Sequence, residues 1–478
     1  MVVAPSTVGV NEPFHVGVKM LTAPYSVGTS STPPCTPSLL GPFNASPRGI
    51  EYLDNVPPDW RGAVDVEGGE GYDGPASFSF AEGSGPLFED PRPIRRFGPV
   101  RFTSPGAHFL TLTTPQSGVT RRSNPIIVTR DAPDERLYWG DLHLQTYFSD
   151  GLRSPEALYC FARDEAFLDI CALSDHTKSL TDRQWDYFAA VTNDFNEPGR
   201  FVTLVGQEWT SKTWGHRNVY FPGDKGPILR RDDPVHGELP KVYEVAREHG
   251  ALVIPHHSAR ADVELDWSIG HDSEVERLVE VYSVWGNSER PEQDGNPRPI
   301  RVYKGEKQGQ HVVDALRLGR RFGFTGGGDI HDGRPGDELH HFQERPREYR
   351  LLRRQGITGV WAGALTREAI FEALWNRRVY ATSNVRILLR FSIDGHPMGS
   401  EITSEGDPTF RVAAYSEVPI GRVDIVKDGE HLITLRPAAQ KFEWEGEDRL
   451  TRPTSWYYVR VTREDGEMAW SSPIWVSR

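Results

Sequence analysis

The stretch Leu137-Tyr-Trp-Gly-Asp-Leu-His143 joins a short apolar run to two side chains that can bind a metal ion. The run has the length and composition of a buried strand, and Asp141 and His143 follow it directly. This pattern recurs along the next 190 or so residues of the chain: a strand-like run has a polar residue at or just beyond its end. The later polar residues are Asp175-His176, Glu208, His256-His257, Glu280 and Asp329-Ile-His331.

These polar residues are far apart in sequence, but a barrel of parallel strands would bring them together. The C-terminal ends of the strands of an α/β barrel converge on one face, so the side chains that follow them share one site. A single histidine at a strand end is more often a cap or a surface residue, and it is the recurrence that indicates a metal centre. Imidazole nitrogens and carboxylate oxygens suit Zn²⁺, Mn²⁺ or Fe²⁺.

The chain of 478 residues is long enough for about three domains. Residues 1–136 carry short alternating runs between Gly, Pro and Ser clusters and are expected to form a β-rich N-terminal region. Residues 137–384 alternate apolar runs with amphipathic segments and predict the metal-binding α/β barrel. Helices are expected after Ser154, from 239 or 240 to 249, over 312–320 and after Thr366. Alternation returns over 385–478, which predicts a β-sandwich.

Composition excludes several classes of protein. The 67 acidic and 54 basic residues give a formal charge of −13, which argues against broad nucleic-acid binding. The three cysteines show no CxxC spacing, so neither a disulfide framework nor a cysteine-based zinc site is expected. No apolar run approaches the length of a membrane span, and the N-terminal sequence lacks a signal-peptide pattern, so we expect no membrane partner and a cytoplasmic location. Twelve of the 16 histidines fall within residues 138–341.

Residues 141–151, Asp-Leu-His-Leu-Gln-Thr-Tyr-Phe-Ser-Asp-Gly, resemble the opening motif D-L-H-x-H-T-x-x-S-D-G of the PHP (polymerase and histidinol phosphatase) superfamily. The later motifs of that superfamily resemble, in the correct order, Ser174-Asp-His176, Glu208, His216, Pro255-His256 and Asp329-Ile-His331. With its β-rich flanks, the whole chain is most similar to the DUF3604 branch of PHP-like proteins.

The resemblance implies a distorted (β/α)7 PHP-like barrel that holds two or three divalent metals at its C-terminal face. Carried over residue by residue, one metal would have His143, Glu208 and Asp329 as ligands, and Glu208 would bridge to a second metal near His216. A third metal would have as ligands Asp150, His176 and His256, and His331 would complete one of the latter two sites.

One position departs from the motif. Gln145 stands where the superfamily has its second histidine, and an amide oxygen is a weaker ligand than an imidazole. We therefore expect between one and three metal ions per chain.

These residues predict a metal-dependent hydrolase, phosphoesterase-like in its chemistry. Bound metals lower the pKa of a water towards neutrality and so supply a hydroxide nucleophile, with a phosphoester as the favoured substrate. The candidate cationic partners of an anionic substrate are Lys178, Arg217 and Arg260, which stand beside the motif residues in sequence. Either His257 or His331 is expected to protonate the leaving group, and His257 is alternatively a residue that orients a ligand.

Two alternatives stay open at this point. The same centre could hydrolyse a non-phosphate ester, an amide or another organic compound, and four tryptophans near the motifs are compatible with an aromatic substrate. The chain could instead be a non-catalytic binding module, in which the β-rich regions recognise a ligand and the barrel is a scaffold. In every enzymatic interpretation the partner is a small-molecule substrate, anionic or aromatic. The sequence does not determine the oligomeric state or the role of the flanking regions.

Overall fold

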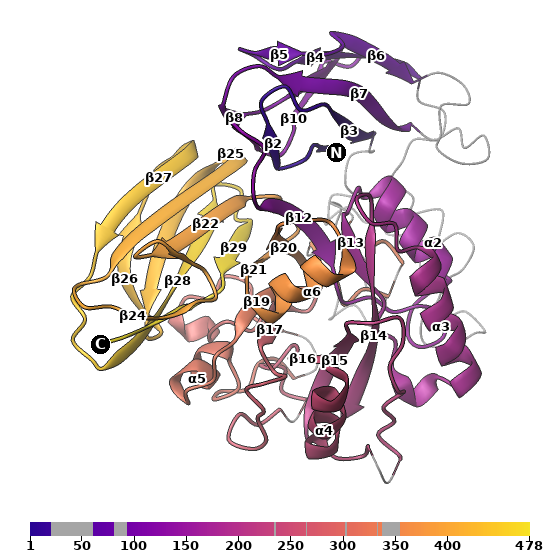
Figure 1. Cartoon of the computed structure of the whole chain (residues 1–478), viewed down its shortest axis with the longest axis vertical. Helices are drawn as coiled ribbons and strands as arrows, with labels where there is room; N and C mark the ends of the chain where they lie inside the picture. Colours follow the sequence, from indigo (N-terminus) through magenta and orange to yellow (C-terminus); the bar gives the residue numbers. More distant parts are fainter. Residues whose placement is uncertain are drawn as a thin grey trace. The chain divides into compact units, whose positions relative to one another are not determined.

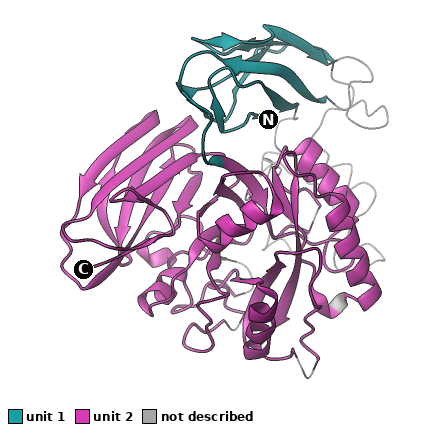
Figure 2. Cartoon of the chain, viewed as in Figure 1, with its two compact units in different colours: residues 1–136, 337–352 teal, residues 137–336, 353–478 magenta. Residues whose placement is uncertain are grey.

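The computed structural model describes residues 1–20, 61–80, 93–233, 236–263, 265–301, 304–331, 333–336 and 354–478. The chain divides into two compact units (Figure 2). The described part of unit 1 lies within residues 1–136, and unit 2 contains residues 137–336 and 353–478. Unit 2 therefore includes both the region predicted as a barrel and the region predicted as a C-terminal sandwich. The finer division into three domains remains a prediction. Cys35, His340 and His341 lie outside the described residues.

Unit 1 is built from short strands in three sheets, with orders β1-β3-β7-β5, β10-β9-β4-β6 and β2-β11-β8. Its alternating sequence puts Val16, Val64, Phe97, Phe102 and Leu112 into one apolar core. The strands are β1 (Val2–Val3), β2 (Thr7–Gly9), β3 (Phe14–Lys19), β4 (Gly62–Glu67), β5 (Tyr72–Asp73), β6 (Ser77–Phe80), β7 (Ile94–Phe102), β8 (Gly106–His108), β9 (Thr111–Thr114), β10 (Val119–Arg122) and β11 (Ile126–Thr129).

The first half of unit 2 carries the strands whose ends were predicted to hold metal ligands (Figure 1). These strands are β12 (Arg136–Asp141), β13 (Ile170–Ala172), β14 (Val202–Ser211), β15 (Gly215–Phe221), β16 (Leu252–Pro255), β17 (Leu278–Ser283), β18 (Gly286–Asn287), β19 (Gly323–Gly326), β20 (Ile357–Ala362) and β21 (Val379–Thr382). β12, β13 and β14 pair in parallel, and β17 pairs in parallel with β19.

Among the described residues, five α-helices alternate with these strands. They are α2 (Pro155–Cys160), α3 (Asp182–Asp194), α4 (Leu239–His249), α5 (Val312–Arg317) and α6 (Arg367–Trp375). The Ser154 and Thr366 side chains accept hydrogen bonds from the third backbone N–H of α2 and α6, as their sequence patterns predict. Gly250 ends α4 in the left-handed conformation, with a φ of 61°. None of the described helices combines the length and the apolar character that a membrane crossing requires.

The mixed α/β class is confirmed, but unit 2 is mostly sheet, and a regular (β/α)7 barrel is not shown. β14, β15 and β16 are consecutive antiparallel neighbours. The connection between β14 and β15 is only three residues, 212–214. A parallel connection needs a crossover of about a dozen residues or more, so this segment can only form a hairpin. Strand β14 also runs on to Ser211, beyond the apolar run that ends at Val205.

The second half of unit 2 is an antiparallel β-structure that continues the same sheet, because β21 pairs with β29. The 19-residue strand β25 pairs with four others, β22, β26, β27 and β28. The strands are β22 (Leu388–Ile393), β23 (His396–Pro397), β24 (Glu401–Thr403), β25 (Thr409–Lys427), β26 (Glu430–Leu435), β27 (Ala439–Glu447), β28 (Thr454–Arg463), β29 (Met468–Ser471) and β30 (Ile474–Ser477).

A buried charge joins the two halves of unit 2. The Glu289 carboxylate, which follows β18, accepts hydrogen bonds from Arg460 Nη1 at 2.6 Å and from Trp470 Nε1 at 2.7 Å. The Tyr458 hydroxyl donates to the same carboxylate. All four side chains are buried. Burial raises the pKa of Glu289, but the Arg460 charge and these donors outweigh it, so the carboxyl stays ionised with a lowered pKa.

We predict that Glu289→Ala lowers the free energy of unfolding of unit 2 by about 3–5 kcal/mol, because it leaves the Arg460 charge buried and unpaired. Urea unfolding followed by tryptophan fluorescence measures the change, since Trp470 reports on this contact. The control is Glu445→Ala, which removes an exposed ion pair with Arg411 and is expected to cost about 1 kcal/mol or less. Equal losses for the two variants would contradict this role of Glu289.

Candidate metal centre

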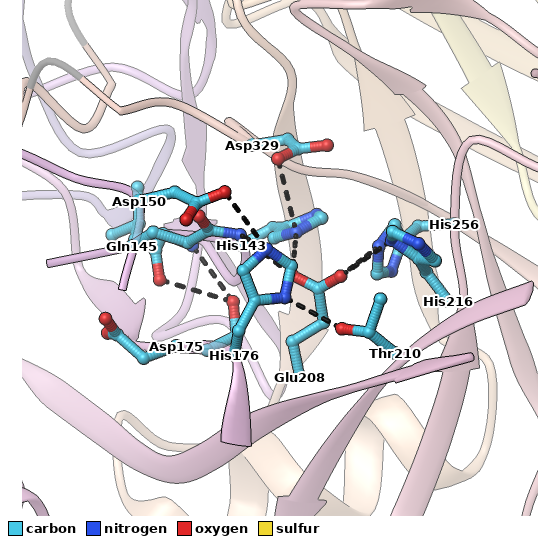
Figure 3. Close-up of polar contacts among 12 residues, drawn as sticks. His143, Gln145, Asp150, Asp175, His176, Glu208, Thr210, His216, His256 and Asp329 are labelled. Atoms are coloured by element: carbon cyan, nitrogen blue, oxygen red, sulfur yellow. Dashed lines mark hydrogen bonds and ion pairs between the residues drawn. The ribbon is translucent and has the colours of Figure 1, made fainter. Parts of the chain in front are cut away.

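The carboxylate of Glu208 is the centre of the site, and it is buried (Figure 3). Strand alternation puts Glu208 and Thr210 on one face of β14, and the pairing of Thr210 with His216 brings the β15 histidine to that face. Oε1 of Glu208 lies 2.9 Å from His216 Nδ1 and 3.2 Å from His256 Nε2. Both contacts reach the same oxygen from adjacent strands.

The second oxygen of Glu208 faces the opposite side of the cluster. Oε2 lies 3.3 Å from His176 Nδ1 and 3.6 Å from His143 Nε2. It also accepts a hydrogen bond of 2.8 Å from the Gln145 amide. One buried carboxylate thus contacts four imidazoles and one amide, and no lysine or arginine makes an ion pair with it among the described residues.

His143 is oriented by a second carboxylate. Its Nδ1 lies 2.9 Å from Glu280 Oε2 in the buried strand β17. In its neutral form His143 donates its Nδ1 proton to Glu280 and keeps the lone pair on Nε2, which lies 3.5 Å from Asp329 Oδ1 as well as facing Glu208. A carboxylate hydrogen-bonded to one ring nitrogen, with the other nitrogen facing further ligand atoms, is the usual arrangement of a metal-binding histidine.

The chain following β19 approaches His143 so closely that only glycine fits. A Cβ on Gly327 would lie 2.1 Å from Glu280 Oε2, and one on Gly328 would lie 2.5 Å from Asp141 Oδ2. Asp329 then adopts a φ of 47°, which is rare for a residue with a side chain. Its backbone N–H donates to the His143 carbonyl at 2.7 Å. The strained backbone therefore carries the Asp329 carboxylate to the cluster.

His257 shares this strain and touches the same carboxylate. Its φ is 32°, its Nδ1 lies 3.0 Å from Asp329 Oδ2, and its Nε2 lies 3.2 Å from His216 Nδ1. His257 is thus positioned both to orient Asp329 and to offer a ligand atom beside His216. Orienting a ligand is one of the two roles predicted for His257, and the other, protonation of a leaving group, stays a prediction.

Three groups of buried side chains have ligand atoms close enough to surround one ion. Within each group the atoms lie within 4.8 Å of one another. The groups are His143, Glu208 and His256; His143, Glu280 and Asp329; and His216, His256 and His257. Several of the atoms are buried without a hydrogen-bond partner in the described structure, among them His143 Nε2, Gln145 Oε1, His256 Nδ1 and Glu280 Oε1. Unsatisfied buried donors and acceptors are costly, so the donor set fits bound cations.

The carboxylates of the cluster carry negative charge, and some of its imidazoles carry positive charge. Burial raises the pKa of Glu208 and Asp329, but the neighbouring imidazoles outweigh it and hold both pKa values well below the usual range. Burial lowers the pKa of His143, but the nearby carboxylates outweigh it and raise that pKa, and His176 behaves in the same way. Burial and the charge of His143 lower the pKa of His256 to about 3. The carboxylates are therefore ionised, and two of the histidines hold the compensating protons.

Gln145 lies inside this arrangement. Its Nε2 is 3.3 Å from His176 Nε2 in addition to donating to Glu208. A rotation of the amide by half a turn exchanges Nε2 with Oε1, the two atoms being nearly indistinguishable in shape. The oxygen would then face Glu208 and His176, where it can contact a cation. Gln145 thus lies within the cluster, and its role as a neutral ligand stays a prediction.

Loop 145–151 is fixed to the cluster by Asp175, whose carboxylate accepts from Thr146 Oγ1 at 3.0 Å and Ser149 Oγ at 2.6 Å. Burial raises the pKa of Asp175 to about 6. The same loop carries Asp150, whose Oδ2 lies 3.5 Å from His176 Nε2. His331 enters from the other side, with Nε2 at 3.8 Å from Asp329 Oδ1.

The three predicted cationic partners are placed differently. Lys178 is exposed and close enough to lower the pKa of Asp150 and His176 electrostatically. Arg260 pairs with Asp262 at 2.8 Å and lies over the Trp285 ring, 5.8 Å from its centroid. Arg217 is not brought to the cluster, because its buried guanidinium is bound to Glu276 at 2.9 Å. Neighbouring residues of a strand face opposite sides, so Arg217 points away from the side of His216.

Two site residues were not in the predicted ligand set. The sequence places Glu280 among the polar residues of the strand-like runs but not among the metal ligands. Its apolar run, Leu278-Val-Glu-Val281, indicates a buried carboxylate. Thr210 accepts or donates a 2.8 Å hydrogen bond at His176 Nδ1. Its position two residues after Glu208 places it on the same strand face, which is a signal that the sequence also carries.

Comparisons with known proteins show which sequences and structures the chain is similar to. Residues 154–262 and 320–421 match the model of a family described as a protein of unknown function, DUF3604. An uncharacterized protein of Chlamydia muridarum is 30% identical over 400 residues, which cover 78% of this chain and 63% of that protein. An uncharacterized protein of Chlamydia pneumoniae is 30% identical over 397 residues, with the same coverage. The match thus spans less than two thirds of the length of these relatives.

Among solved structures, the chain is similar to a two-domain protein from Bacteroides vulgatus, described as containing a predicted PHP-like metal-dependent phosphoesterase. The sequences are 15% identical, the match covers 72% of this chain and 97% of that one, and the TM-score is 0.39.

We predict that Glu208→Gln reduces the affinity for divalent metal by more than about 100-fold, since changes even outside the ligand shell cost about 10–100-fold. Elemental analysis of protein purified without chelator or added metal measures the content. The control is Glu445→Gln, which neutralises an exposed acid outside every candidate ligand group and should keep the wild-type content. The variant Gln145→His should raise the content. Equal content in all four proteins would contradict the assignment.

Metal affinity should rise with pH. The pKa values of His143 and His176 are raised, so both imidazoles hold protons above the ordinary histidine pKa, and a cation must displace those protons. Calorimetric titration at about pH 6 and about pH 8, in buffers of different ionisation enthalpy, measures affinity and proton release together. We expect tighter binding at the higher pH and net proton release at the lower one. An affinity that is flat or falls over this range would show that these histidines are not displaced.

Proposed function

We propose that unit 2 is a metal-dependent hydrolase that acts on a phosphoester through one or more divalent cations held at the Glu208 cluster. The observation that carries the proposal is the buried Glu208 carboxylate with imidazoles against both of its oxygens. A purely structural role would be served by one arginine and would not need strained backbone at Asp329. The residues that would hold the cations are His143, Gln145, Asp150, His176, Glu208, His216, His256, Asp329 and His331.

Zinc, manganese and iron all suit this donor set, because it combines imidazole nitrogen with carboxylate oxygen and lacks thiolate. A bound divalent cation lowers the pKa of a coordinated water and polarises the bond to be broken. The number of cations in the proposal is one to three. Gln145, in place of a histidine, is the reason why the first site, that of His143, Glu208 and Asp329, is proposed to be the weakest.

The remaining residues of the cluster bind and move protons. Burial lowers the pKa of both His257 and His331, so both imidazoles are neutral near pH 7. A neutral imidazole accepts a proton from the attacking water and can return it to the leaving group. This role is proposed for His257, or for His331 in the arrangement in which His331 does not bind a cation. Glu280 keeps the His143 ring in one orientation throughout, through the 2.9 Å contact to Nδ1.

A phosphoester suits two cations near the cluster. Lys178 is exposed near Asp150 and His176, and Arg260, which is buried and pairs with Asp262, acts on His216 and His257 through its charge. These two cations are the proposed partners of the substrate's phosphoryl oxygens. Arg217 has no part in this proposal, because it faces the side of β15 opposite to His216, where it pairs with Glu276. The proposed partner is therefore a small anionic molecule.

A second candidate substrate is an ester or amide with an aromatic group. The centroid of the Trp285 ring lies 6.1 Å from that of the His331 ring, and the Arg260 guanidinium lies over the Trp285 ring, 5.8 Å from its centroid. An aromatic surface next to a proposed proton-transfer residue can bind a planar group. The same nucleophile would then attack a carbonyl carbon. A non-catalytic binding module, the third interpretation, would retain its ligand when the cluster is disrupted.

The test is hydrolysis by full-length protein reconstituted separately with Zn²⁺, Mn²⁺ and Fe²⁺. The substrates are aryl phosphate monoesters and diesters and the matching aryl carboxylic esters, with release of the phenol as the common signal. We expect metal-dependent cleavage of a phosphate ester and a loss of at least about 1,000-fold in kcat/KM for Glu208→Gln. His249→Ala, which removes an exposed histidine at the end of α4, should retain wild-type activity. Cleavage of carboxylic esters alone would favour the second candidate, and no metal-dependent cleavage of either would contradict a hydrolase.

A further inference from the structure

A cluster of arginines lies in unit 2 at the ends of the strands opposite to the metal centre. Arg277 directly precedes β17, Arg321 lies two residues before β19, and Arg377 lies two residues before β21. The parallel register of Leu278 with Gly323 places the first two at the same strand ends. A Cβ on Gly323 would lie 2.8 Å from the Cβ of Arg377, so Arg377 is at this end as well. Asp329 follows the other end of β19.

These side chains border a cavity of about 300 Å³ that opens to solvent. Its size is at the lower end of the range for pockets that bind small molecules. Three elements contribute to its wall: the start of β17, the end of α6 with the turn into β21, and the turn between β23 and β24. The lining residues are Arg277, Glu372, Asn376, Arg377, Arg378, Pro397, Gly399, Ser400 and Glu401.

Positive charge is in excess in this cavity, and the two lining carboxylates are already bound. Glu401 Oε1 accepts from Arg377 Nη2 at 2.6 Å, and its Oε2 pairs with Arg321. Glu372 pairs with Arg378 at 3.5 Å. Each acid is thus occupied by an arginine.

Arg277 is the arginine whose charge is not balanced. Its Nε donates to the Trp375 carbonyl at the end of α6, and its guanidinium lies 5.6 Å from the centroid of the Trp375 ring. Its two Nη nitrogens make no hydrogen bond, and the side chain makes no ion pair, with any residue that the structure describes. These contacts orient the guanidinium and leave two donor nitrogens available at the cavity wall.

Repulsion between the arginines adds to this excess. Burial lowers the pKa of Arg377, and the neighbouring Arg277 and Arg321 charges lower it further, while Glu401 only partly offsets them. The same burial lowers the pKa of Arg277. Like charges held together at a concave surface favour an anion, because the anion relieves their repulsion.

We propose that this cavity is a second binding site, which takes the phosphate group of a small phosphorylated molecule at the Arg277 guanidinium. Arg377 contributes its charge but no free donor, because its three guanidinium nitrogens already donate to Gly399, Arg321 and Glu401. The Arg277 guanidinium supplies a forked pair of donors suited to a tetrahedral oxyanion. Asn376 and Ser400, which also line the cavity, supply neutral polar groups beside it. The site does not depend on the proposed hydrolysis, because it shares no residue with the metal centre.

Calorimetric titration of full-length protein with inorganic phosphate, at constant ionic strength, tests the proposal. We expect one saturable site per chain and a loss of at least about tenfold in affinity for Arg277→Gln, the order expected when a charge-assisted hydrogen bond is removed. Glu401→Gln, which removes the competing carboxylate, should bind phosphate more tightly than the wild type. Arg411→Gln, which changes an exposed arginine on β25, is the matched control and should bind as the wild type does.

The Glu208→Gln variant separates this site from the metal centre. Phosphate binding that survives in Glu208→Gln and weakens in Arg277→Gln supports the arginine site, whatever the outcome of the hydrolysis assay. Binding that is lost in Glu208→Gln and unchanged in Arg277→Gln would place phosphate at the metal centre and overturn the proposal, as would the absence of saturable binding. Acetate at the same concentration should bind more weakly, and equal or tighter binding of acetate would overturn the choice of phosphate.

Discussion

The buried charge of Glu208 is the constraint on which the rest of the site depends. A carboxylate removed from water must be matched by donors or opposite charges, and here the match comes from imidazoles rather than from arginine or lysine. His216 and His256 contact one oxygen, and His143 and His176 contact the other. Imidazoles can release their protons, so the arrangement that satisfies the carboxylate in the metal-free chain can exchange those protons for a cation.

The backbone around Glu208 adopts the conformations that bring its partners to the carboxylate. The hairpin of β14 and β15 delivers Glu208 and His216 together, and the two glycines after β19 let the chain pass against Glu280 and Asp141. Positive φ values at His257 and Asp329 are the cost of placing two ligand-bearing side chains at this point. Unfavourable conformations are thus concentrated where ligand atoms converge, which is typical of a functional site rather than of a scaffold.

The sequence predicted the parts of the fold that have local causes. Two helices begin after Ser154 and Thr366, whose side chains cap them, and α4 ends at Gly250, which adopts the left-handed conformation. Each of these residues is a local sequence signal for a helix end. The antiparallel pairing of β14 with β15 was not predicted, because it depends on a three-residue connection that can be recognised only once both strands are known. Helix α3 was also missed, although Thr181 and Gln184 form a capping box.

In the candidate site, positions at strand ends predicted which side chains lie close together. Adjacency in the sequence did not predict which further residues contact them. Arg217 is next to His216 in sequence but faces the opposite side of β15, where Glu276 binds it. Glu280, 137 residues from His143 in sequence, touches it at 2.9 Å. Long-range partners of this kind follow from the sheet register, which a single sequence does not specify.

A crystal structure of protein purified with its own metal, with anomalous diffraction measured at the zinc, manganese and iron edges, decides whether the Glu208 cluster is a metal centre. We expect at least one anomalous peak at coordination distance, about 2.0–2.2 Å, from Glu208 and from a nitrogen of His143 or His256. A map without such a peak, from crystals grown in the presence of these metals and with the Glu208 contacts to the four histidines unchanged, would contradict it.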